Sequence, residues 1–86
     1  MSVKVIKFGA SWCSPCKTVS NLLKKIQTDV LTEEVDIDEE IQLSLQYGIR
    51  SVPVLIALKD HLEVERLSGS QTQQSLQNWY NKLVTI

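Results

Sequence analysis

Short apolar runs alternate with amphipathic stretches along the chain, and this alternation predicts strands and helices in turn. Residues Val3 to Phe8 are apolar apart from two lysines, which indicates a strand that is buried on both faces. From Ser14 to about Thr28, apolar residues recur at helical spacing, and Pro15 suits the first turn of a helix. A second strand is predicted from Val30 to Ile37.

The middle of the chain predicts a short helix followed by a hairpin. Asp38 is expected to cap a helix that runs to about Gln46. Residues Val52 to Leu58 form the most strand-like run, with Pro53 at its entry. After a tight connection, residues Leu62 to Leu67 alternate apolar and charged side chains, as a half-exposed strand does.

A last helix is predicted near the end of the sequence. Ser70 and Gln73 have the spacing of a capping box. The side chains that we expect on its buried face are Leu76, Trp79, Tyr80 and Leu83. The elements follow one another as βαβαββα without a repeat or a linker, and we expect residues 1–86 to form one domain.

Composition and charge exclude several classes of protein. The 86 residues are 43% apolar and carry a net charge of −1. There is no cluster of basic residues that would suggest a nucleic acid as partner. The longest apolar run, residues 52–58, is too short to span a membrane, and from the strand pattern that starts near Val3 we expect no signal peptide. We therefore expect a protein of the reducing cytoplasm, with neither a membrane nor a nucleic acid as partner.

The candidate chemistry lies between the first strand and the first helix. Cys13 and Cys16 are the only cysteines, are separated by two residues, and stand where the helix begins. Unpaired backbone N–H groups and the helix dipole make a thiol at this position more acidic and more available as a nucleophile. In a reducing compartment this spacing predicts thiol–disulfide exchange.

Two other interpretations of the cysteines are open at this point. Zinc requires four ligands, and the only further soft ligand is His61, which is far along the chain. A pair of unreactive core thiols is the second alternative, because free cysteine is often buried. Trp12 before the pair and Pro15 within it favour redox chemistry over both.

The sequence resembles the thioredoxin family at two separate motifs. Residues 12–17 (Trp-Cys-Ser-Pro-Cys-Lys) are similar to the active-site motif of that family, with Ser14 where glycine is usual. Residues 47–53 (Tyr-Gly-Ile-Arg-Ser-Val-Pro) resemble the segment that enters the central strand through a cis-proline, and Gly69 fits a glycine after the last strand. The resemblance covers about residues 3–83, without the N-terminal strand and helix of full-length thioredoxins. It implies an α/β thioredoxin fold: a four-stranded mixed sheet of order 2-1-3-4, with three helices distributed over both faces.

The resemblance also implies roles for the site residues. Cys13 would attack a substrate disulfide, and Cys16 would resolve the mixed disulfide that results. We expect Cys13 to be exposed and Cys16, one helical turn further on, to be shielded. The Val52–Pro53 bond is expected to be cis, with the Val52 backbone opposite Cys13. The residues expected to form the apolar surface that docks a substrate are Trp12, Ser14, Pro15, Val52, Pro53 and Gly69.

Two departures from the family pattern predict a modified site. Gly9 stands at a position that is often aromatic, which should loosen the packing beneath the cysteines. Lys7 stands where thioredoxins commonly bury an aspartate, and Glu34 stands where they place a lysine on the neighbouring strand. We therefore predict a charge-reversed pair that handles charge and protons near Cys16. The alternative is two separate solvated residues, because charged side chains are usually exposed.

The function that these residues imply is the reduction of protein disulfides through the Cys13-Ser14-Pro15-Cys16 dithiol. An external electron donor of the thioredoxin-reductase type would restore the dithiol, with no metal or organic cofactor, and we expect a monomer. One alternative is a glutaredoxin-like reductase that uses glutathione, although residues 67–70 (Leu-Ser-Gly-Ser) lack the Gly-Gly turn typical of that family. The other is a thioredoxin-fold partner subunit that binds another protein without redox chemistry.

Overall fold

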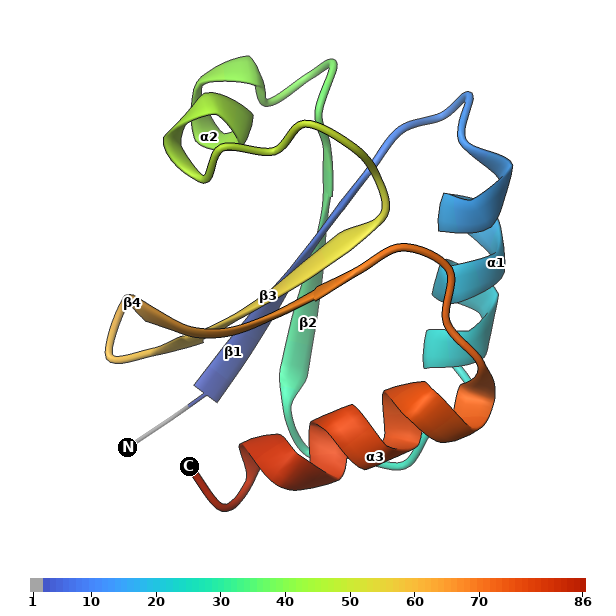
Figure 1. The fold of residues 1–86 in the computed structure, drawn as a ribbon, viewed down its shortest axis with the longest axis vertical. Helices are drawn as coiled ribbons and strands as arrows, with labels where there is room; N and C mark the ends of the chain where they lie inside the picture. Colours follow the sequence, from blue (N-terminus) through green and yellow to red (C-terminus); the bar gives the residue numbers. More distant parts are fainter. Residues whose placement is uncertain (1–2) are drawn as a thin grey trace.

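Four strands form one mixed sheet in the computed structural model, which describes residues 3–86 (Figure 1). The strands are β1 (Val3–Gly9), β2 (Leu31–Asp36), β3 (Val54–Lys59) and β4 (Leu62–Ser68). Their order in the sheet is β2-β1-β3-β4. Strand β1 is parallel to β2 and antiparallel to β3, and β3 and β4 form an antiparallel hairpin. The predicted strand order is confirmed.

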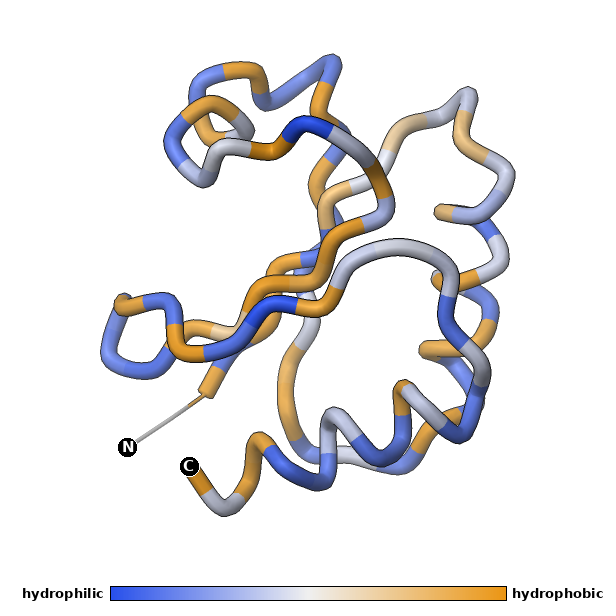
Figure 2. Tube along the Cα trace, viewed as in Figure 1, coloured by the Kyte–Doolittle hydropathy of each residue, from blue (hydrophilic) through white to orange (hydrophobic). Residues whose placement is uncertain are grey.

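Three helices cover the two faces of this sheet (Figure 1). They are α1 (Ser14–Leu23), α2 (Ile41–Gln46) and α3 (Gln73–Leu83). Helices α1 and α3 pack on one face, and α2 lies over the other. Figure 2 shows that hydrophobic residues concentrate along the central strands, while the helices alternate between hydrophobic and hydrophilic positions.

The alternation of side chains along β1 supplies both halves of the core. Val5 packs with the α1 and α3 side chains, whereas Ile6 and Phe8 pack on the α2 side. The predicted burial of both faces of this strand is therefore confirmed. Lys7 belongs to the same face as Val5, because successive side chains of a strand point to opposite faces. A lysine is thus directed from the central part of the sheet toward α1.

Helix α1 ends at Leu23, several residues before the predicted end near Thr28. The reason is a tertiary contact that replaces helical hydrogen bonds at Gln27. The Gln77 side chain of α3 accepts a hydrogen bond from the Gln27 N–H at 2.9 Å and donates one to the Gln27 carbonyl oxygen at 2.8 Å. The backbone at Gln27 is therefore satisfied without continuing the helix.

Asp38 does not cap α2, contrary to the prediction. The N-cap residue is Glu40, which makes no side-chain hydrogen bond to the helix. The chain between β2 and α2 instead turns on Asp36, whose carboxylate accepts the Asp38 N–H at 2.8 Å. This turn leaves the Asp38 carboxylate free for a contact in the functional site.

Strand β3 begins at Val54 rather than at the predicted Val52, so that Pro53 precedes the ladder. Proline has no N–H to donate, which keeps it outside the regular pairing. The connection between β3 and β4 is tight, with Asp60 and His61 at positive φ values of 53° and 70°. His61 lies exposed in this turn, as expected.

The capping box of α3 is formed by Thr72 and Ser75, and the predicted pair of Ser70 and Gln73 is wrong. The Thr72 hydroxyl accepts the Ser75 N–H at 3.0 Å, and the Ser75 hydroxyl accepts the Thr72 N–H at 3.0 Å. The predicted buried face of α3 is confirmed, since Leu76, Trp79, Tyr80 and Leu83 are all buried.

Replacing Thr72 by alanine is expected to lower the free energy of unfolding by about 1 kcal/mol, because a helix N-cap is lost. Urea unfolding followed by circular dichroism measures the change. Ser70→Ala is the matched control, and its effect should stay within about 0.5 kcal/mol because the residue is exposed and outside the cap. Equal effects of the two variants would contradict the assignment of the cap.

Candidate active site

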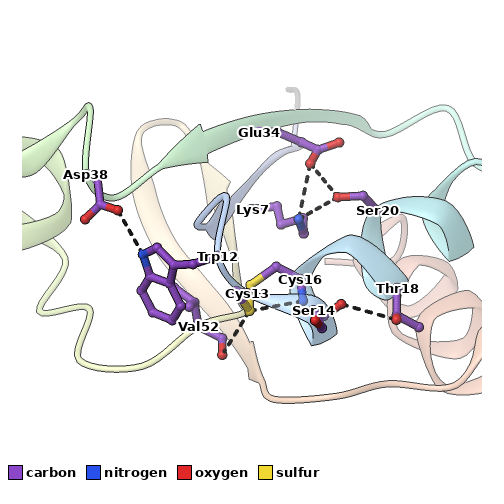
Figure 3. Close-up of a disulfide and its surroundings, with 10 residues drawn as sticks. All are labelled: Lys7, Trp12, Cys13, Ser14, Cys16, Thr18, Ser20, Glu34, Asp38 and Val52. Atoms are coloured by element: carbon purple, nitrogen blue, oxygen red, sulfur yellow. Dashed lines mark hydrogen bonds and ion pairs between the residues drawn. A yellow bond between two sulfur atoms is a disulfide. The ribbon is translucent and has the colours of Figure 1, made fainter.

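Cys13 and Cys16 form a disulfide at the N-terminus of α1 (Figure 3). Cys13 is the N-cap residue, and its Sγ accepts a hydrogen bond from the Cys16 N–H at 3.2 Å. Pro15 lies in the first turn, where its missing N–H costs nothing. Once the disulfide is reduced, the same N–H and the helix dipole stabilise a negative charge on the Cys13 sulfur.

A second segment, far along the chain, meets the disulfide. The Val52 carbonyl oxygen lies 3.9 Å from Cys13 Sγ, and the Val52–Pro53 bond is cis, as predicted. Gly69, at the end of β4, donates its N–H to the Pro53 carbonyl oxygen at 2.9 Å. Its φ of +83° is one that glycine adopts without strain. The fold therefore brings Cys13, Val52, Pro53 and Gly69 to one end of the sheet.

Both cysteines are buried, and the expectation of an exposed Cys13 is wrong for the oxidised protein. Cys13 exposes 5% of its surface and Cys16 exposes 3%, because they pack together with Ala10, Ile37 and Val52. The exposed rim is formed by the residues around them. Trp12 exposes 67% of its surface, and Ser14 and Pro15 are also exposed.

Trp12 is held in place by a contact that the sequence pattern did not reveal. Its indole Nε1–H donates to the Asp38 Oδ2 at 2.9 Å (Figure 3). The two residues are 26 positions apart, so no local spacing signals the pair. This contact explains why Asp38 serves the site instead of capping α2.

The predicted charge-reversed pair exists. Lys7 and Glu34 are directly opposite each other in the parallel ladder of β1 and β2, and Lys7 Nζ lies 3.2 Å from Glu34 Oε1. The Lys7 side chain is only 4% exposed, whereas that of Glu34 is 53% exposed. The alternative of two solvated residues is therefore wrong for Lys7. A buried ammonium is costly unless it is paired, which accounts for the position of the carboxylate.

Ser20 is the third member of this group and was not predicted from the sequence. Lys7 Nζ donates to Ser20 Oγ at 2.6 Å, and Ser20 Oγ donates to Glu34 Oε1 at 2.6 Å (Figure 3). Ser20 follows Cys16 by four residues on α1, a spacing that places both on one side of a helix and that could have indicated it.

The electrostatics of this group favour an ionised Glu34. Partial burial raises the pKa of Glu34, but hydrogen bonds from Ser20 and Lys7 and the positive charges of Lys7 and Lys24 outweigh that effect. The pKa of the carboxyl is therefore lowered from its ordinary value of 4.5. At neutral pH the group holds a buried cation against a carboxylate that reaches solvent.

A hollow of about 310 Å³ opens beside this group. The residues that line it are Lys7, Gly9, Ala10, Ser11, Cys16, Lys17, Ser20, Glu34, Val35, Asp36 and Glu39. It lies where the sequence predicted loose packing, at the glycine that replaces an aromatic residue. The structure thus places both Lys7 and Cys16 on the wall of a cavity that is open to solvent.

The residues that the structure describes form neither a metal site nor a membrane-spanning helix. Within residues 3–86, no three His, Cys, Asp or Glu side chains are arranged to hold a metal ion. In the same range, none of the helices is both long and apolar enough to cross a membrane. A disulfide-forming Cys-x-x-C pair at the start of a helix, opposite a proline loop, defines the site of a thiol–disulfide oxidoreductase.

The chain belongs to the thioredoxin family, whose sequence model matches residues 2–82. It is 39% identical over 75 residues to a thioredoxin from Chlamydia caviae, a match that covers 84% of this chain and 74% of the relative. A Bacillus subtilis thioredoxin is 32% identical over 84 residues, covering 93% of this chain and 81% of the relative. These relatives agree with the Cys13–Cys16 pair in assigning the activity of a protein-disulfide reductase.

Solved structures agree with this family assignment. An N21Q mutant thioredoxin from Halobacterium salinarum superposes with a TM-score of 0.87 at 31% identity, covering 94% of this chain and 74% of that one. The oxidised thioredoxin from Plasmodium falciparum gives 0.83 at 26% identity, covering 95% and 81%. The four-stranded thioredoxin fold inferred from the sequence is therefore confirmed.

Proposed function

We propose that Cys13 is the attacking thiol and Cys16 the resolving thiol of this reductase. The Cys13 thiolate attacks one sulfur of a substrate disulfide, which forms a Cys13–substrate disulfide and releases the other substrate sulfur as a thiolate. Cys16 then loses its proton and attacks Cys13 Sγ. The Cys13–Cys16 bond forms, the bond to the substrate breaks, and the second substrate sulfur leaves as a thiolate that takes up a proton.

The observation that carries this assignment is the position of Cys13 Sγ. It accepts the Cys16 N–H at the helix N-terminus and faces the Val52 carbonyl. A thiolate there has a backbone donor and the positive end of the helix dipole. Cys16 lies within the first turn of α1 and, beside Lys7, on the wall of the hollow.

The substrate class that fits the rim is a protein with an accessible disulfide. The exposed indole of Trp12 and the neighbouring Ser14 and Pro15 offer contact area beside the buried disulfide. Val52 and Gly69, which are both partly exposed, are proposed to complete this docking surface. Pro53 was expected on the same surface, but its side chain is fully buried, so that expectation is wrong and Pro53 only shapes the loop that carries Val52. Val52, which is partly exposed, presents backbone groups to which an extended substrate chain can bind.

Lys7 and Glu34 are proposed to serve Cys16. The Lys7 ammonium favours a nearby thiolate electrostatically. Glu34 would accept the proton of Cys16 through water, and its half-exposed carboxylate passes that proton to solvent. Because the pKa of Glu34 is lowered, the carboxylate is ionised at neutral pH and has an oxygen available to accept a proton.

The remaining parts of the proposal concern the setting of the reaction. An electron donor of the thioredoxin-reductase type would return the disulfide to the dithiol. A reducing cytoplasm suits a dithiol that must stay reduced between turnovers. We propose that residues 1–86 act as one domain and as a monomer.

Reduction of a disulfide-bonded protein in two parallel assays tests this proposal. One assay supplies NADPH and a thioredoxin reductase, and the other supplies NADPH, glutathione reductase and glutathione. Turnover is expected with the first donor, and the Cys13→Ser, Cys16→Ser double variant should give none. Turnover with glutathione alone would contradict the proposed donor. Activity of the double variant in its biological setting would indicate a partner subunit that acts without redox chemistry.

A further inference from the structure

Gly9 lies on the same face of β1 as Lys7, two residues further along the strand. A Cβ atom at Gly9 would lie 3.3 Å from Lys7 Nζ and 3.5 Å from Cys16 Sγ. It would also lie 3.3 Å from Cys16 Cβ. The missing side chain therefore leaves a gap between the ammonium of Lys7 and the sulfur of Cys16.

The backbone does not require glycine at this position. Gly48 and Gly69 have positive φ values of 64° and 83°, which favour glycine, but Gly9 is not in that conformation. An alanine at residue 9 could adopt the same backbone. The alanine would close the gap, because its Cβ atom would lie only 3.3 Å from Cys16 Cβ and Lys7 Nζ, which is closer than most Cβ atoms approach their neighbours.

The gap at Gly9 is continuous with the hollow that Cys16, Lys7, Ser20 and Glu34 line together. Figure 3 shows the Lys7 ammonium between the disulfide and the Ser20–Glu34 pair. Ser20 bonds both Lys7 and Glu34 and so fixes the ammonium and the carboxylate relative to each other. The Glu34 carboxylate is half exposed, so the hollow leads from the buried sulfur to a group that exchanges protons with solvent.

We propose that Gly9 is a positioning residue that keeps this gap open, so that Lys7 stays close to Cys16 and water can enter between the Cys16 thiol and Glu34. The proposal rests on the proposed function, in which Cys16 is the resolving thiol. The proton of the Cys16 thiol passes through that water to the Glu34 carboxylate. The Cys16 thiolate then attacks Cys13 Sγ, and the substrate thiolate that leaves recovers a proton from Glu34 or from solvent.

Other charged groups face the same space and bear on its pH dependence. They are Lys17 on α1, Asp36 at the end of β2 and Glu39 in the turn before α2. Lys24 does not line the hollow, but its charge acts on Glu34. A methyl group at residue 9 leaves all of them in place. A change in the pH dependence of Gly9→Ala therefore reports on the gap itself.

The test uses a chromogenic disulfide that releases a coloured thiol in each of two steps. The first burst reports attack by Cys13, and the second reports resolution by Cys16. In Gly9→Ala the second phase should be about tenfold slower at pH 7, because separating Lys7 from Cys16 lowers the fraction of Cys16 that is thiolate. At a pH below the pKa of a thiol, each unit by which that pKa rises lowers the thiolate fraction tenfold. The difference should vanish at high pH, and the first phase should be unchanged.

A double-mutant cycle with Lys7→Met separates the proposed effect from simple overpacking. If the methyl group acts by interrupting the contact of Lys7 with Cys16, Gly9→Ala should add little in the Lys7→Met background. An equal slowing in both backgrounds would overturn the role given to Lys7. A loss that is the same at every pH, or a pH profile of the second phase that matches the wild type, would overturn the proposal as a whole.

A measurement on the unmodified protein keeps the proposal testable if Gly9→Ala does not fold. In D₂O the second phase should slow more than the first, because only resolution moves a proton through water. Equal slowing of the two phases would overturn the water path. The Cys16→Ser variant distinguishes failure of this inference from failure of the proposed function. It must lack the second phase if Cys16 is the resolving thiol, whatever Gly9→Ala does.

Discussion

Replacing Cys16 by serine is expected to stop turnover completely and to leave the protein covalently linked to its disulfide substrate. The Cys13 thiolate keeps its backbone donor at the helix N-terminus, so attack on the substrate continues. The serine hydroxyl cannot displace the substrate sulfur from Cys13, because thiol–disulfide exchange requires a thiolate as the nucleophile. The mixed disulfide therefore accumulates.

Non-reducing gel electrophoresis and intact-mass measurement detect this adduct. Cys13→Ser is the matched control, since it removes the other thiol of the pair and should give neither turnover nor an adduct. Trapping by Cys13→Ser with none by Cys16→Ser would reverse the roles proposed for the two thiols. The same adducts, isolated from cells, would identify the protein substrates.

Glu34→Gln and Lys7→Met are expected to change stability in different directions, although each breaks the same ion pair. Glu34→Gln leaves the Lys7 ammonium buried without a counter-charge, and should cost about 2 kcal/mol, the loss typical of a hydrogen bond to a charged group. For a domain of this size that loss corresponds to a fall in melting temperature of about 10 °C. Lys7→Met removes the buried charge at similar volume, while Glu34 turns to solvent, so stability should be unchanged or higher.

The loss in Glu34→Gln should depend on pH. The pKa of Glu34 is lower in the folded protein than in the unfolded chain, where it is near 4.5. The ionised carboxylate therefore stabilises the fold fully at pH values above the pKa of the unfolded chain. That contribution disappears as the pH falls through the lower, folded pKa. The wild type and Glu34→Gln should therefore differ fully at neutral pH and converge below about pH 4.5.

Thermal unfolding of both variants across this pH range measures these effects. Glu33→Gln and Lys4→Met are the matched controls, because Glu33 and Lys4 form the neighbouring pair of the same two strands but are half exposed. Each control should change the free energy of unfolding by less than about 1 kcal/mol. A Glu34→Gln effect as small as that of Glu33→Gln would show that Lys7 does not depend on its partner.

Much of this fold follows from local patterns in the sequence. The apolar run of β1 and the stripe on α3 correspond to elements with the predicted faces. The strand β4 also forms, but its apolar residues Leu62 and Val64 are exposed, so its alternation did not predict the buried face. The Cys-x-x-C pair needs only two residues of spacing and the start of a helix, both of which are local. Even the pairing of Lys7 with Glu34 could be inferred from the family resemblance, because strand register ties positions in one strand to positions in the next.

Apart from the cap of α3, which Thr72 and Ser75 form locally, the features that the sequence did not reveal depend on contacts between distant segments. Helix α1 ends early because Gln77, fifty residues away, satisfies the backbone at Gln27. Asp38 binds Trp12 instead of capping α2, and Cys13 is buried because Ile37 and Val52 pack around it. The joining of Ser20 to Lys7 and Glu34, and the gap that Gly9 leaves beside Cys16, arise only when α1 packs on β1 and β2. Local propensities differ by a few tenths of a kcal/mol per residue, so packing and the need to pair a buried charge override them wherever the two conflict.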